Sequence, residues 1–334
     1  MNYPEISVIT PTFNQGHFIE ETIDSVLSQQ YPALQYFIMD GGSTDNTREI
    51  IKKYEKHLAG WVSEKDKGQS DAINKGLKKI SGEIVNWLNS DDSYTPGTLH
   101  KVAHYFSDPH ILSVCGTSRV YGKEKEFIAP GTWVGKDIQS TINHLHVEQP
   151  ATFFRKKATD KMGPVSEVLH FVMDKEWWLK YIMLFGISGV KKCDDVFVNF
   201  RLHEDSKTVS LSEKFNIDHA TLVSNLLRQH DYSDLAEMAA TKYPVNREYQ
   251  FTIPVPSMVT AKMIERMGVS FLLKKTQMVY SENDFQVAKQ FSQWLKHHPV
   301  HLDEREQQWK MKLDEMTKPA NWFLFRLRRK IKGN

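Results

Sequence analysis

The sequence has little cysteine, no long apolar run and no excess of charge of either sign. Its two cysteines, Cys115 and Cys193, stand in apolar surroundings, which predicts reduced core residues of an intracellular protein and excludes a disulfide framework. No stretch approaches the roughly 18 consecutive apolar residues of a membrane span, so any membrane contact is expected to be peripheral. The 43 basic and 41 acidic residues nearly cancel, so no global field favours nucleic acid as a partner. The chain opens on polar residues, and no signal peptide is expected.

What the sequence does contain is one unit repeated over its first 90 residues: a short apolar run, a polar loop and a helical pattern. Strands are predicted at residues 6–10, 36–39, 61–63 and 84–88, with helices at 18–27, 46–58 and 72–80. Strands that alternate with helices in this way predict an α/β fold with a parallel sheet and right-handed crossovers. Ligands of such sheets bind at the carboxyl ends of the strands, where the four loops are expected to converge.

After residue 96 the pattern is less regular. Strands are predicted at residues 112–116, 119–121, 149–155 and 194–202, with helices at 97–106 and 174–185, and residues 123–148 have no assignment. From about residue 210 only helical patterns occur, at 215–229, 257–280, 284–297 and 304–316. We therefore expect three parts: an α/β domain over residues 1–205, a helical region over 206–317 and a tail over 318–334.

Two adjacent carboxylates, Asp91 and Asp92, follow the predicted strand at residues 84–88. Neighbouring carboxylates repel each other unless a cation or solvent compensates their charge. Hard oxygen ligands in a loop suit Mg²⁺ or Mn²⁺ that holds a substrate phosphate. The alternative interpretation is a solvated Asp-Asp turn before a helix.

The loops after the other strands carry further candidates for ligand contacts. Asp40 opens the segment Asp-Gly-Gly-Ser-Thr-Asp, where it could bind a nucleotide base or ribose, and an ordinary glycine turn with a helix cap is the alternative. Thr10, Pro11 and Thr12 form either a wall for the base or a simple turn.

Asp66 and Asp71 lie in the third loop, where they either reach the ribose and pyrophosphate or stay solvated. Asp174 opens a heavily aromatic helix, and the helix dipole with its apolar neighbours could hold it ready to accept a proton. An ordinary N-terminal helix acid is the alternative. His203 follows a predicted strand and is either a metal ligand through its imidazole or a structural residue.

Residues 318–332 contain basic side chains and no acidic one. On a helical wheel Phe323, Leu324, Leu327 and Ile331 share one side, whereas Trp322 and Phe325 fall outside that face. This is the character of an interfacial helix that binds anionic lipid. A basic helix docked on its own protein is the alternative.

The order of the loop motifs along the chain resembles that of the family 2 glycosyltransferases. The resemblance rests on residues 6–14, 37–45, 68–76 and 87–92, and it continues through 149–155, 173–174 and 200–203. It covers roughly the first 205 residues, and the remainder resembles no family that we can name. The resemblance implies a GT-A fold, a nucleoside diphosphate sugar as donor, usually a UDP-sugar, and an inverting hexosyltransferase.

The resemblance also assigns roles to individual residues. Pro11 and Asp40 correspond to contacts with the base, Asp66 to a nucleotide contact, and Asp174 to the general base. The sequence departs from the family's DxD signature at its first acidic position, which is Asn89 here. An amide accepts from a ribose hydroxyl but carries no charge, so the metal is expected to depend on other ligands. The expected donor contacts are Thr10, Pro11, Thr12, Asp40, Asp66, Asp71, Asn89, Ser90 and Asp91, and the expected ligands of Mn²⁺ or Mg²⁺ are Asp91, Asp92 and His203.

The expected function is therefore metal-assisted transfer of a sugar to a hydroxyl of a glycan or lipid-linked saccharide, at the inner face of the cell membrane. One alternative is an inactive sugar- or nucleotide-binding protein, for which Asn89 is the only support. Another is a nucleotidyltransferase, but residues 10–16 lack the glycine-rich, basic phosphate loop that it would favour.

Overall fold

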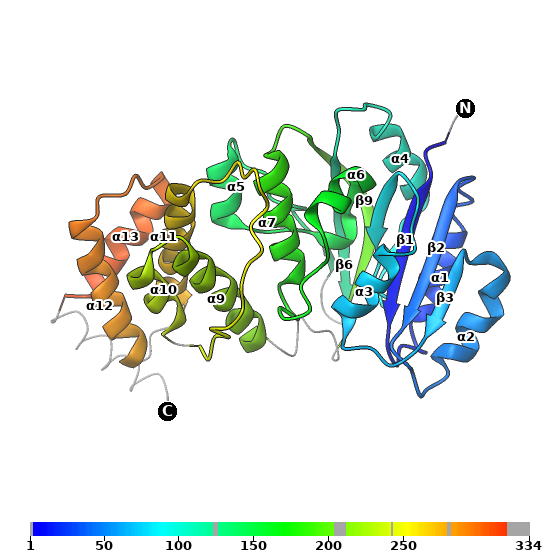
Figure 1. The fold of residues 1–334 in the computed structure, drawn as a ribbon, viewed down its shortest axis with the longest axis horizontal. Helices are drawn as coiled ribbons and strands as arrows, with labels where there is room; N and C mark the ends of the chain where they lie inside the picture. Colours follow the sequence, from blue (N-terminus) through cyan, green and yellow to red (C-terminus); the bar gives the residue numbers. More distant parts are fainter. Residues whose placement is uncertain (1–2, 123–125, 204–211, 242, 279–281, 319–334) are drawn as a thin grey trace. The chain divides into compact units, whose positions relative to one another are not determined.

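The computed structural model describes residues 3–122, 126–203, 212–241, 243–278 and 282–318. The chain divides into two compact units, residues 1–215 with 253–258, and residues 216–252 with 259–334 (Figure 1). The predicted boundary at 205/206 and most of the predicted tail lie outside the described residues.

Among the described residues, nine strands of the first unit form one mixed sheet. Its spatial order is β3 (Gly60–Ser63), β2 (Leu34–Asp40), β1 (Ile6–Thr12), β4 (Ile84–Trp87), β8 (Thr152–Arg155), β6 (Ser113–Gly122), β9 (Val190–Leu202) and β5 (Ser93–Tyr94), and β7 (Glu126–Ile128) pairs with β6. The first four strands are mutually parallel, as predicted, so their carboxyl ends meet at one edge. β8 is antiparallel to both of its neighbours, and β6 and β9 are parallel to each other.

One face of the parallel half is covered by α1 (Ile19–Leu27), α2 (Thr47–Tyr54) and α4 (Thr98–Tyr105). Ile23 of α1, Ile51 of α2 and Leu99 of α4 are buried in the same apolar cluster as Val8 and Ile38 of the sheet. Successive strand residues point to opposite faces, so Ile9 faces the other layer. Because both faces are covered by helices, these strands have continuous apolar sequences.

The second face is covered by α3 (Gln69–Leu77), α6 (Lys156–Met162) and α7 (Met173–Phe185). α3 lies close to β1 because Gly76 has no side chain, and a Cβ there would be 2.5 Å from a methyl carbon of Ile9. The ring of Trp177 in α7 lies 5.1 Å from that of Trp87 at the end of β4. This contact holds the first turns of α7 near the carboxyl end of β4.

The segments after residue 96 differ from the prediction in several places. β6 is one strand instead of two, with a register irregularity around Gly116, where the side chain of Phe197 fills the space of a Cβ. The predicted strand at 149–155 begins as the short helix η2 (Gln149–Ala151), because Pro150 has no N–H for a strand ladder. The unassigned stretch 123–148 contains β7 and α5 (Ile138–His144), which starts with a capping box at Asp137. The short elements α6 and β5 were not predicted.

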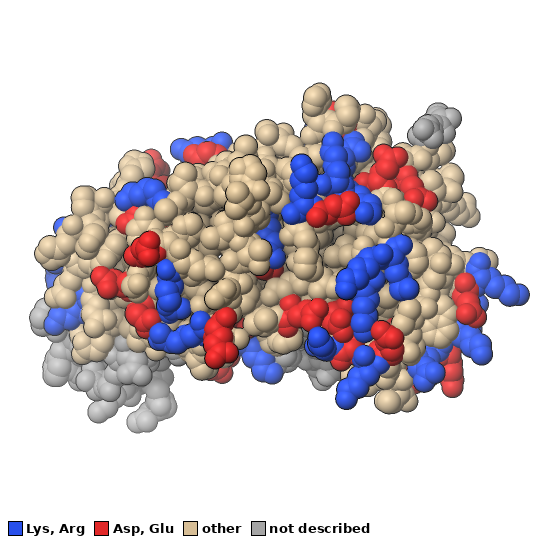
Figure 2. Space-filling model, in the orientation of Figure 1, with Lys and Arg blue, Asp and Glu red and all other residues tan. Residues whose placement is uncertain are grey.

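The second unit is helical, as predicted. Its helices are α9 (Ser212–Gln229), which begins in the first unit, α10 (Ser233–Ala240), α11 (Ala261–Met278), α12 (Glu282–His297) and α13 (Glu304–Met316), of which α10 was not predicted. α11 packs on α13, where Arg266 pairs with the buried Glu306. In the part of the chain that the structure describes, no helix is long and apolar enough to span a bilayer. Basic and acidic side chains are interspersed over the face drawn in Figure 2.

Candidate active site

The carboxyl ends of β1, β2 and β3 are tied together by polar side chains. Asp40 ends β2 and is buried, and its carboxylate accepts hydrogen bonds from the Ser43 N–H (3.1 Å), the Ser43 hydroxyl and the hydroxyl of Ser63 at the end of β3 (2.5 Å). In the loop after β1, the Asn14 N–H donates to the Ser43 hydroxyl at 2.7 Å. The three loops are therefore held together around one buried carboxylate.

The predicted contacts at the end of β1 have different surroundings. Thr10 is fully buried, and its hydroxyl lies 3.0 Å from the Tyr36 hydroxyl on β2, so it supports the sheet. Pro11 and Thr12 are also buried, beside Met39 and Asp40 in the register of the sheet. The hydroxyl of Thr12 has no hydrogen-bond partner among the described residues. An unpartnered buried hydroxyl is uncommon in proteins, and a bound ligand would supply its partner.

Asp66 lies directly over the backbone of the loop after β2. A Cβ on Gly41 would be 2.6 Å from Asp66 Oδ2, so glycine is what permits this approach. Asp66 Oδ1 accepts from the Gly68 N–H at 2.9 Å. Burial raises the pKa of Asp66, and the nearby charges of Asp71 and Asp40 act in the same direction. The structure thus brings Asp40 and Asp66 together, as expected of one binding region.

The carboxylate of Asp71, in contrast, is already bonded to groups of its own loop and of α3. Its carboxylate accepts from the Lys67 N–H at 3.1 Å and pairs with Lys75 at 3.3 Å. Burial alone would raise the pKa of Asp71, but these two partners lower it overall. Asp71 therefore has less free capacity for a ligand than Asp66.

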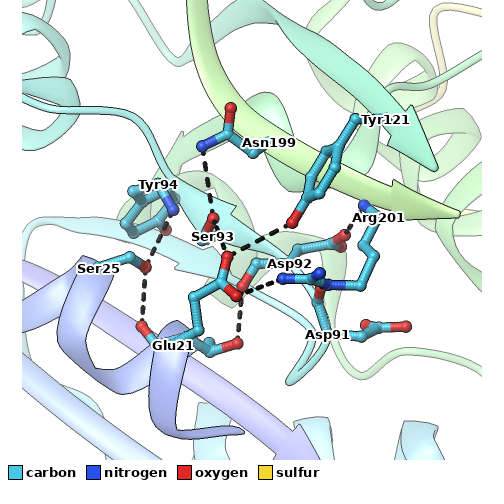
Figure 3. A network of polar contacts seen from close by, with 10 residues as sticks. Glu21, Ser25, Asp91, Asp92, Ser93, Tyr94, Tyr121, Asn199 and Arg201 are labelled. Atoms are coloured by element: carbon cyan, nitrogen blue, oxygen red, sulfur yellow. Dashed lines mark hydrogen bonds and ion pairs between the residues drawn. The ribbon is translucent and has the colours of Figure 1, made fainter. Parts of the chain in front are cut away.

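The loop after β4 directs its two carboxylates to different surroundings. Asp91 is partly exposed, and its Oδ2 lies 3.1 Å from Nε2 of His203, one residue beyond β9. Asp92 is buried, and its Oδ1 accepts from the Arg201 N–H at 3.1 Å. Burial, and next the charge of Asp91, raise the pKa of Asp92 well above its usual range. Figure 3 shows the two side chains pointing apart.

Of the other two predicted residues of this loop, Asn89 is anchored by hydrogen bonds and Ser90 is buried. The side-chain oxygen of Asn89 accepts from Nε2 of Gln69 in α3 at 2.7 Å, and its amide lies 3.5 Å from Asp92 Oδ2. Ser90 is buried between Asn89 and Asp91. The loop therefore spans from α3 on one side to β9 on the other.

Arg201 connects this loop to α1 and β6. Its guanidinium pairs with Glu21 of α1 and donates from Nε to the Asp91 carbonyl at 3.3 Å. The rings of Phe18 and Tyr121 lie 5.3 and 5.0 Å from the guanidinium carbon. Figure 3 shows Tyr121, Ser93 and Arg201 converging on Glu21, 180 residues away from Arg201 in the sequence. No local pattern in the sequence indicates this junction.

Asp174 lies in the first turn of α7, and its Oδ1 accepts from the Lys175 N–H at 2.8 Å. Burial raises the pKa of Asp174, and the charge of Lys175 offsets this in part. Burial also raises the pKa of Glu148, with a further contribution from the charge of Asp174. The charge of Glu148 in turn raises the pKa of Asp92. Glu148 therefore interacts electrostatically with both the predicted base and the loop after β4.

Glu148 was not predicted as a site residue because it ends the stretch without an assignment. The sequence signal that could have found it is the motif at residues 149–155, which begins directly after Glu148. In the structure the side-chain amide of Gln149 donates to the carbonyl of Trp87 at 2.8 Å. This bond attaches η2 to the end of β4. Glu148 itself is fixed through its N–H, which donates to the Thr132 hydroxyl at 2.9 Å.

Asp91 and His203 fit a divalent ion. Asp91 Oδ2 and His203 Nε2 are hydrogen-bonded to each other at 3.1 Å, so a carboxylate oxygen and an imidazole nitrogen, two common kinds of metal ligand, meet at one place. Within the described ranges, no group of three or more His, Cys, Asp or Glu residues is arranged to hold a metal ion, so the predicted set Asp91, Asp92 and His203 is not brought together. Mg²⁺ and similar ions commonly use one or two protein ligands and take the others from water and substrate phosphate. The residues present suit such an open site.

The model of the family described as "Glycosyl transferase family 2" matches residues 7–173, which is half of the chain. The chain belongs to glycosyl transferase family 2. The match includes Asp40, Asp66, Asp91 and Asp92 and ends one residue before Asp174. The predicted family is thereby confirmed.

Curated relatives of this glycosyltransferase carry the same general activity in their names. An uncharacterized glycosyltransferase of Rickettsia typhi is 25% identical over 240 residues, which are 68% of this chain and 72% of that protein. The putative teichuronic acid biosynthesis glycosyltransferase TuaG of Bacillus subtilis is 37% identical over 31% of this chain and 43% of its own length. The poly-beta-1,6-N-acetyl-D-glucosamine synthase of Staphylococcus epidermidis is 32% identical over 47% of this chain and 41% of its own length. The chain is accordingly a glycosyl-transferring enzyme.

Solved structures confirm the predicted GT-A fold with a helical C-terminal region. The alignment with S. aureus TarS 1–349 covers 99% of this glycosyltransferase and 92% of the TarS chain, with a TM-score of 0.60 and 17% identity. TarS 1–349 in complex with UDP-GlcNAc gives a TM-score of 0.54 at 18% identity, covering 92% and 89% of the two chains. The mannosyltransferase PcManGT of Pyrobaculum calidifontis, in complex with GDP-Man and Mn²⁺, gives 0.50 at 16% identity, covering 95% and 88%. At these identities the likeness shows the fold.

Proposed function

We propose that this glycosyltransferase transfers a sugar from a UDP-hexose or UDP-N-acetylhexosamine to a hydroxyl of a glycan or lipid-linked saccharide, with inversion. The observation that carries the proposal is the packing of α7, whose first turn carries Asp174, on the end of β4, whose loop carries Asp91: the rings of Trp177 and Trp87 lie 5.1 Å apart. A base and a phosphate-binding loop at one sheet edge are what a direct displacement at a sugar carbon needs. The UDP-GlcNAc complex of TarS and the N-acetylglucosamine polymer made by the S. epidermidis relative support this donor class.

The nucleotide is proposed to bind over the ends of β1, β2 and β3. Asp40 and Asp66 supply carboxylate acceptors for base and ribose groups, and Pro11 and Thr12 form the wall beside them. The unpartnered hydroxyl of Thr12 supports a ligand on this side. Asn89 and Ser90 contact the ribose side of the diphosphate. We assign Asp71 and Thr10 supporting roles, because Lys75 and Tyr36 already engage their side chains.

We propose that Asp91 and His203 hold Mn²⁺ or Mg²⁺ together with the diphosphate oxygens. When bound, such an ion stabilises the negative charge that develops on the leaving diphosphate. Asp92, the third predicted ligand, is buried and accepts from the Arg201 N–H. We therefore assign Asp92 mainly to holding the loop, with Asp91 as the principal carboxylate ligand.

The reaction is a single displacement with Asp174 as general base. Asp174 takes the proton of the acceptor hydroxyl while that oxygen bonds to the anomeric carbon. The bond from the anomeric carbon to the diphosphate oxygen breaks, and its electron pair leaves with the nucleoside diphosphate. Burial strengthens Asp174 as a base because it raises the pKa of the carboxyl group. No covalent intermediate and no nucleophilic side chain are required.

A panel of donors tests this function. Purified protein is incubated with UDP-, GDP- and dTDP-sugars with Mn²⁺, with Mg²⁺ or with a chelator, and nucleotide release is measured. We expect release from a UDP-sugar that stops with the chelator, and calorimetric binding of UDP that is tighter with Mn²⁺. Release from GDP-sugars alone would overturn the donor assignment, and binding of UDP unaffected by metal would overturn the metal assignment.

We further propose that residues 318–332 bring the enzyme to anionic lipid at the inner face of the cell membrane, where lipid-linked acceptors reside. The support is the basic and apolar composition of this segment. Deletion of residues 318–334 is expected to abolish sedimentation with vesicles that contain anionic lipid, while donor hydrolysis in solution is retained. Unchanged sedimentation of the truncated protein would contradict a membrane role.

A further inference from the structure

The first turn of α1 contacts Asp92, Arg201 and His203, which surround the proposed metal end. Phe18, Glu21 and Thr22 are spaced i, i+3 and i+4, which puts their side chains on one face of a helix. The Thr22 N–H donates to the Phe18 carbonyl at 3.3 Å, so Phe18 belongs to the same turn although it precedes the helix proper. Each of the three side chains reaches a different component of the site.

Thr22 holds the loop that carries the two carboxylates. Its hydroxyl donates to the main-chain carbonyl of Asp92 at 2.7 Å, and both residues are buried. If the Asp92 carbonyl lost this donor while it stayed buried, it would carry the free-energy cost of its desolvation without a hydrogen bond in return. The bond from Thr22 therefore constrains the path of the loop.

Glu21 acts on the same loop through Arg201. The Glu21 carboxylate pairs with the guanidinium, whose Nε donates to the Asp91 carbonyl at 3.3 Å. The backbone N–H of Arg201 donates to Asp92 Oδ1 at 3.1 Å. Arg201 therefore links the loop after β4 to the end of β9, two residues before His203, and Figure 3 shows the Tyr121 hydroxyl and the Arg201 guanidinium both reaching the Glu21 carboxylate.

Phe18 supports the imidazole of His203. The two ring centres are 4.6 Å apart and the ring planes are inclined by 35°, while Nε2 of His203 lies 3.1 Å from Asp91 Oδ2. The ring is thus held between an aromatic face and a carboxylate. Ion ligands need this kind of support because the affinity of a site depends on how well its ligands are oriented before the ion binds.

We propose that the first turn of α1 positions the metal ligands: Thr22 fixes the Asp91–Asp92 loop, Glu21 attaches that loop to β9 through Arg201, and Phe18 orients His203. The inference rests on the proposed function, because that function assigns Asp91 and His203 as ligands. Phe18, Glu21, Thr22 and Arg201 are positioning residues, since they act through Asp91 and His203.

Thr22 provides the sharpest test, because valine has its shape without the hydroxyl and serine keeps the hydroxyl. Thr98→Val is the matched control: Thr98 is also buried in the first turn of a helix, and the carbonyls of Thr95 and Phe197 both lie 2.9 Å from its hydroxyl as acceptors. Free Mn²⁺ is measured by electron paramagnetic resonance in titrations of each protein with UDP present, and thermal unfolding is recorded in parallel. This measures binding without relying on turnover.

We expect Thr22→Val to weaken Mn²⁺ binding by about 10- to 100-fold, the range typical of residues that orient metal ligands. Thr22→Ser should restore binding to within about twofold, and Thr98→Val should bind as the wild type does although it loses a comparable buried bond. Wild-type affinity in Thr22→Val would overturn the inference, and so would equal weakening in Thr98→Val. The proposed function fails separately if Asp91→Asn binds Mn²⁺ as the wild type does.

A second pair of variants covers the case in which Thr22→Val unfolds. Arg201→Lys keeps the positive charge, but an ammonium group lacks the planar set of N–H donors with which the guanidinium bonds Glu21 and the Asp91 carbonyl together. Arg119 on β6 pairs with Glu126 and provides the control Arg119→Lys. We expect Arg201→Lys to weaken Mn²⁺ binding about tenfold and Arg119→Lys to leave it unchanged. Equal Mn²⁺ affinities of the two variants would overturn the role of Arg201.

Discussion

The nucleotide end and the metal end of the candidate site are built in different ways. The nucleotide end comes from the loops after β1, β2 and β3, within the first 71 residues of the chain. Its side chains bond mainly to backbone groups and hydroxyls of neighbouring loops, as Asp40 does to Ser43 and Ser63. The metal end joins residues that are 112 positions apart, as Asp91 and His203 are, or 180 apart, as Glu21 and Arg201 are.

This difference indicates how each end responds to substitution. A pocket made of consecutive loops keeps most of its shape when one side chain changes, because the backbone turns remain. A site assembled from α1, β4, β6, β9 and α7 depends on a few long-range bonds, each of which orients another residue. The buried long-range contacts of the metal end should therefore show the larger effects and the stronger coupling between positions, and its exposed ion pair should not.

The largest effect is expected for Asp174→Asn, which removes the proposed base and leaves the shape of the side chain. Transfer should fall by about 100- to 10,000-fold, with the affinity for UDP unchanged. Because the ionised form is required and burial raises its pKa, the rate should fall as pH is lowered through that raised pKa, at a higher pH than for an exposed aspartate. Initial rates over a pH series measure this. Equal turnover in the variant would mean that Asp174 is not the general base. Asp160→Asn in α6 is the control and should leave the rate unchanged.

The next largest effect separates the two carboxylates of the β4 loop. Asp91→Asn should weaken Mn²⁺ binding in the presence of UDP by about 10- to 100-fold, because it removes a ligand charge. Asp92→Asn should cost less than about fivefold, because asparagine can still accept from the Arg201 N–H and burial already disfavours the charge of Asp92. Equal losses in the two variants would make Asp92 a ligand of the same rank as Asp91.

At the nucleotide end, smaller effects are expected from the two acids of the third loop. Asp66→Asn should weaken UDP binding by about five- to tenfold, the scale of one charge-assisted hydrogen bond that is partly replaced by an amide. Asp71→Asn should change it by less than about twofold, because Lys67 and Lys75 already engage that carboxylate. Calorimetric titration with UDP measures both. A larger loss in Asp71→Asn would reverse the assignment within this loop.

The smallest effect is expected for Glu21→Gln. Glutamine keeps a side-chain oxygen that accepts from the Arg201 guanidinium, so the link remains and only its charge is lost. More than half of the Glu21 side chain is exposed, and the charge of an exposed pair contributes little. Mn²⁺ affinity should change by about twofold or less, and the change should vanish in high salt because the charges are then screened. A tenfold loss that persists in high salt would mean that the charge of Glu21, and not only the Arg201 bonds to the loop, supports the site.

Sequence patterns were sufficient for the parallel half of the sheet. Covered strands are continuously apolar and their loops carry the polar ligands, so β1 to β4 and the acids Asp40, Asp66 and Asp91 could be assigned to one edge. Sequence patterns were not sufficient after residue 96, because the strands there pair with partners that are far away in the sequence. β6 is an example: it is one continuous strand, but its register with β9 shifts around Gly116, where the side chain of Phe197 lies in the space that a Cβ would take. The roles of the individual site residues remain predictions that the variants above test.

The sequence by itself determined the family, the α/β sheet and the identity of the acids at its carboxyl edge, because all three depend on local periodicity and on motifs of fewer than ten residues. Only the tertiary structure decided which partners those acids have. It brought His203 to Asp91, Arg201 to Asp92 and Gln149 to the end of β4, and it placed the first turn of α1 against the β4 loop. The physical reason is that pairing across the sheet depends on which distant strands share a core, and no local pattern of residues contains that information.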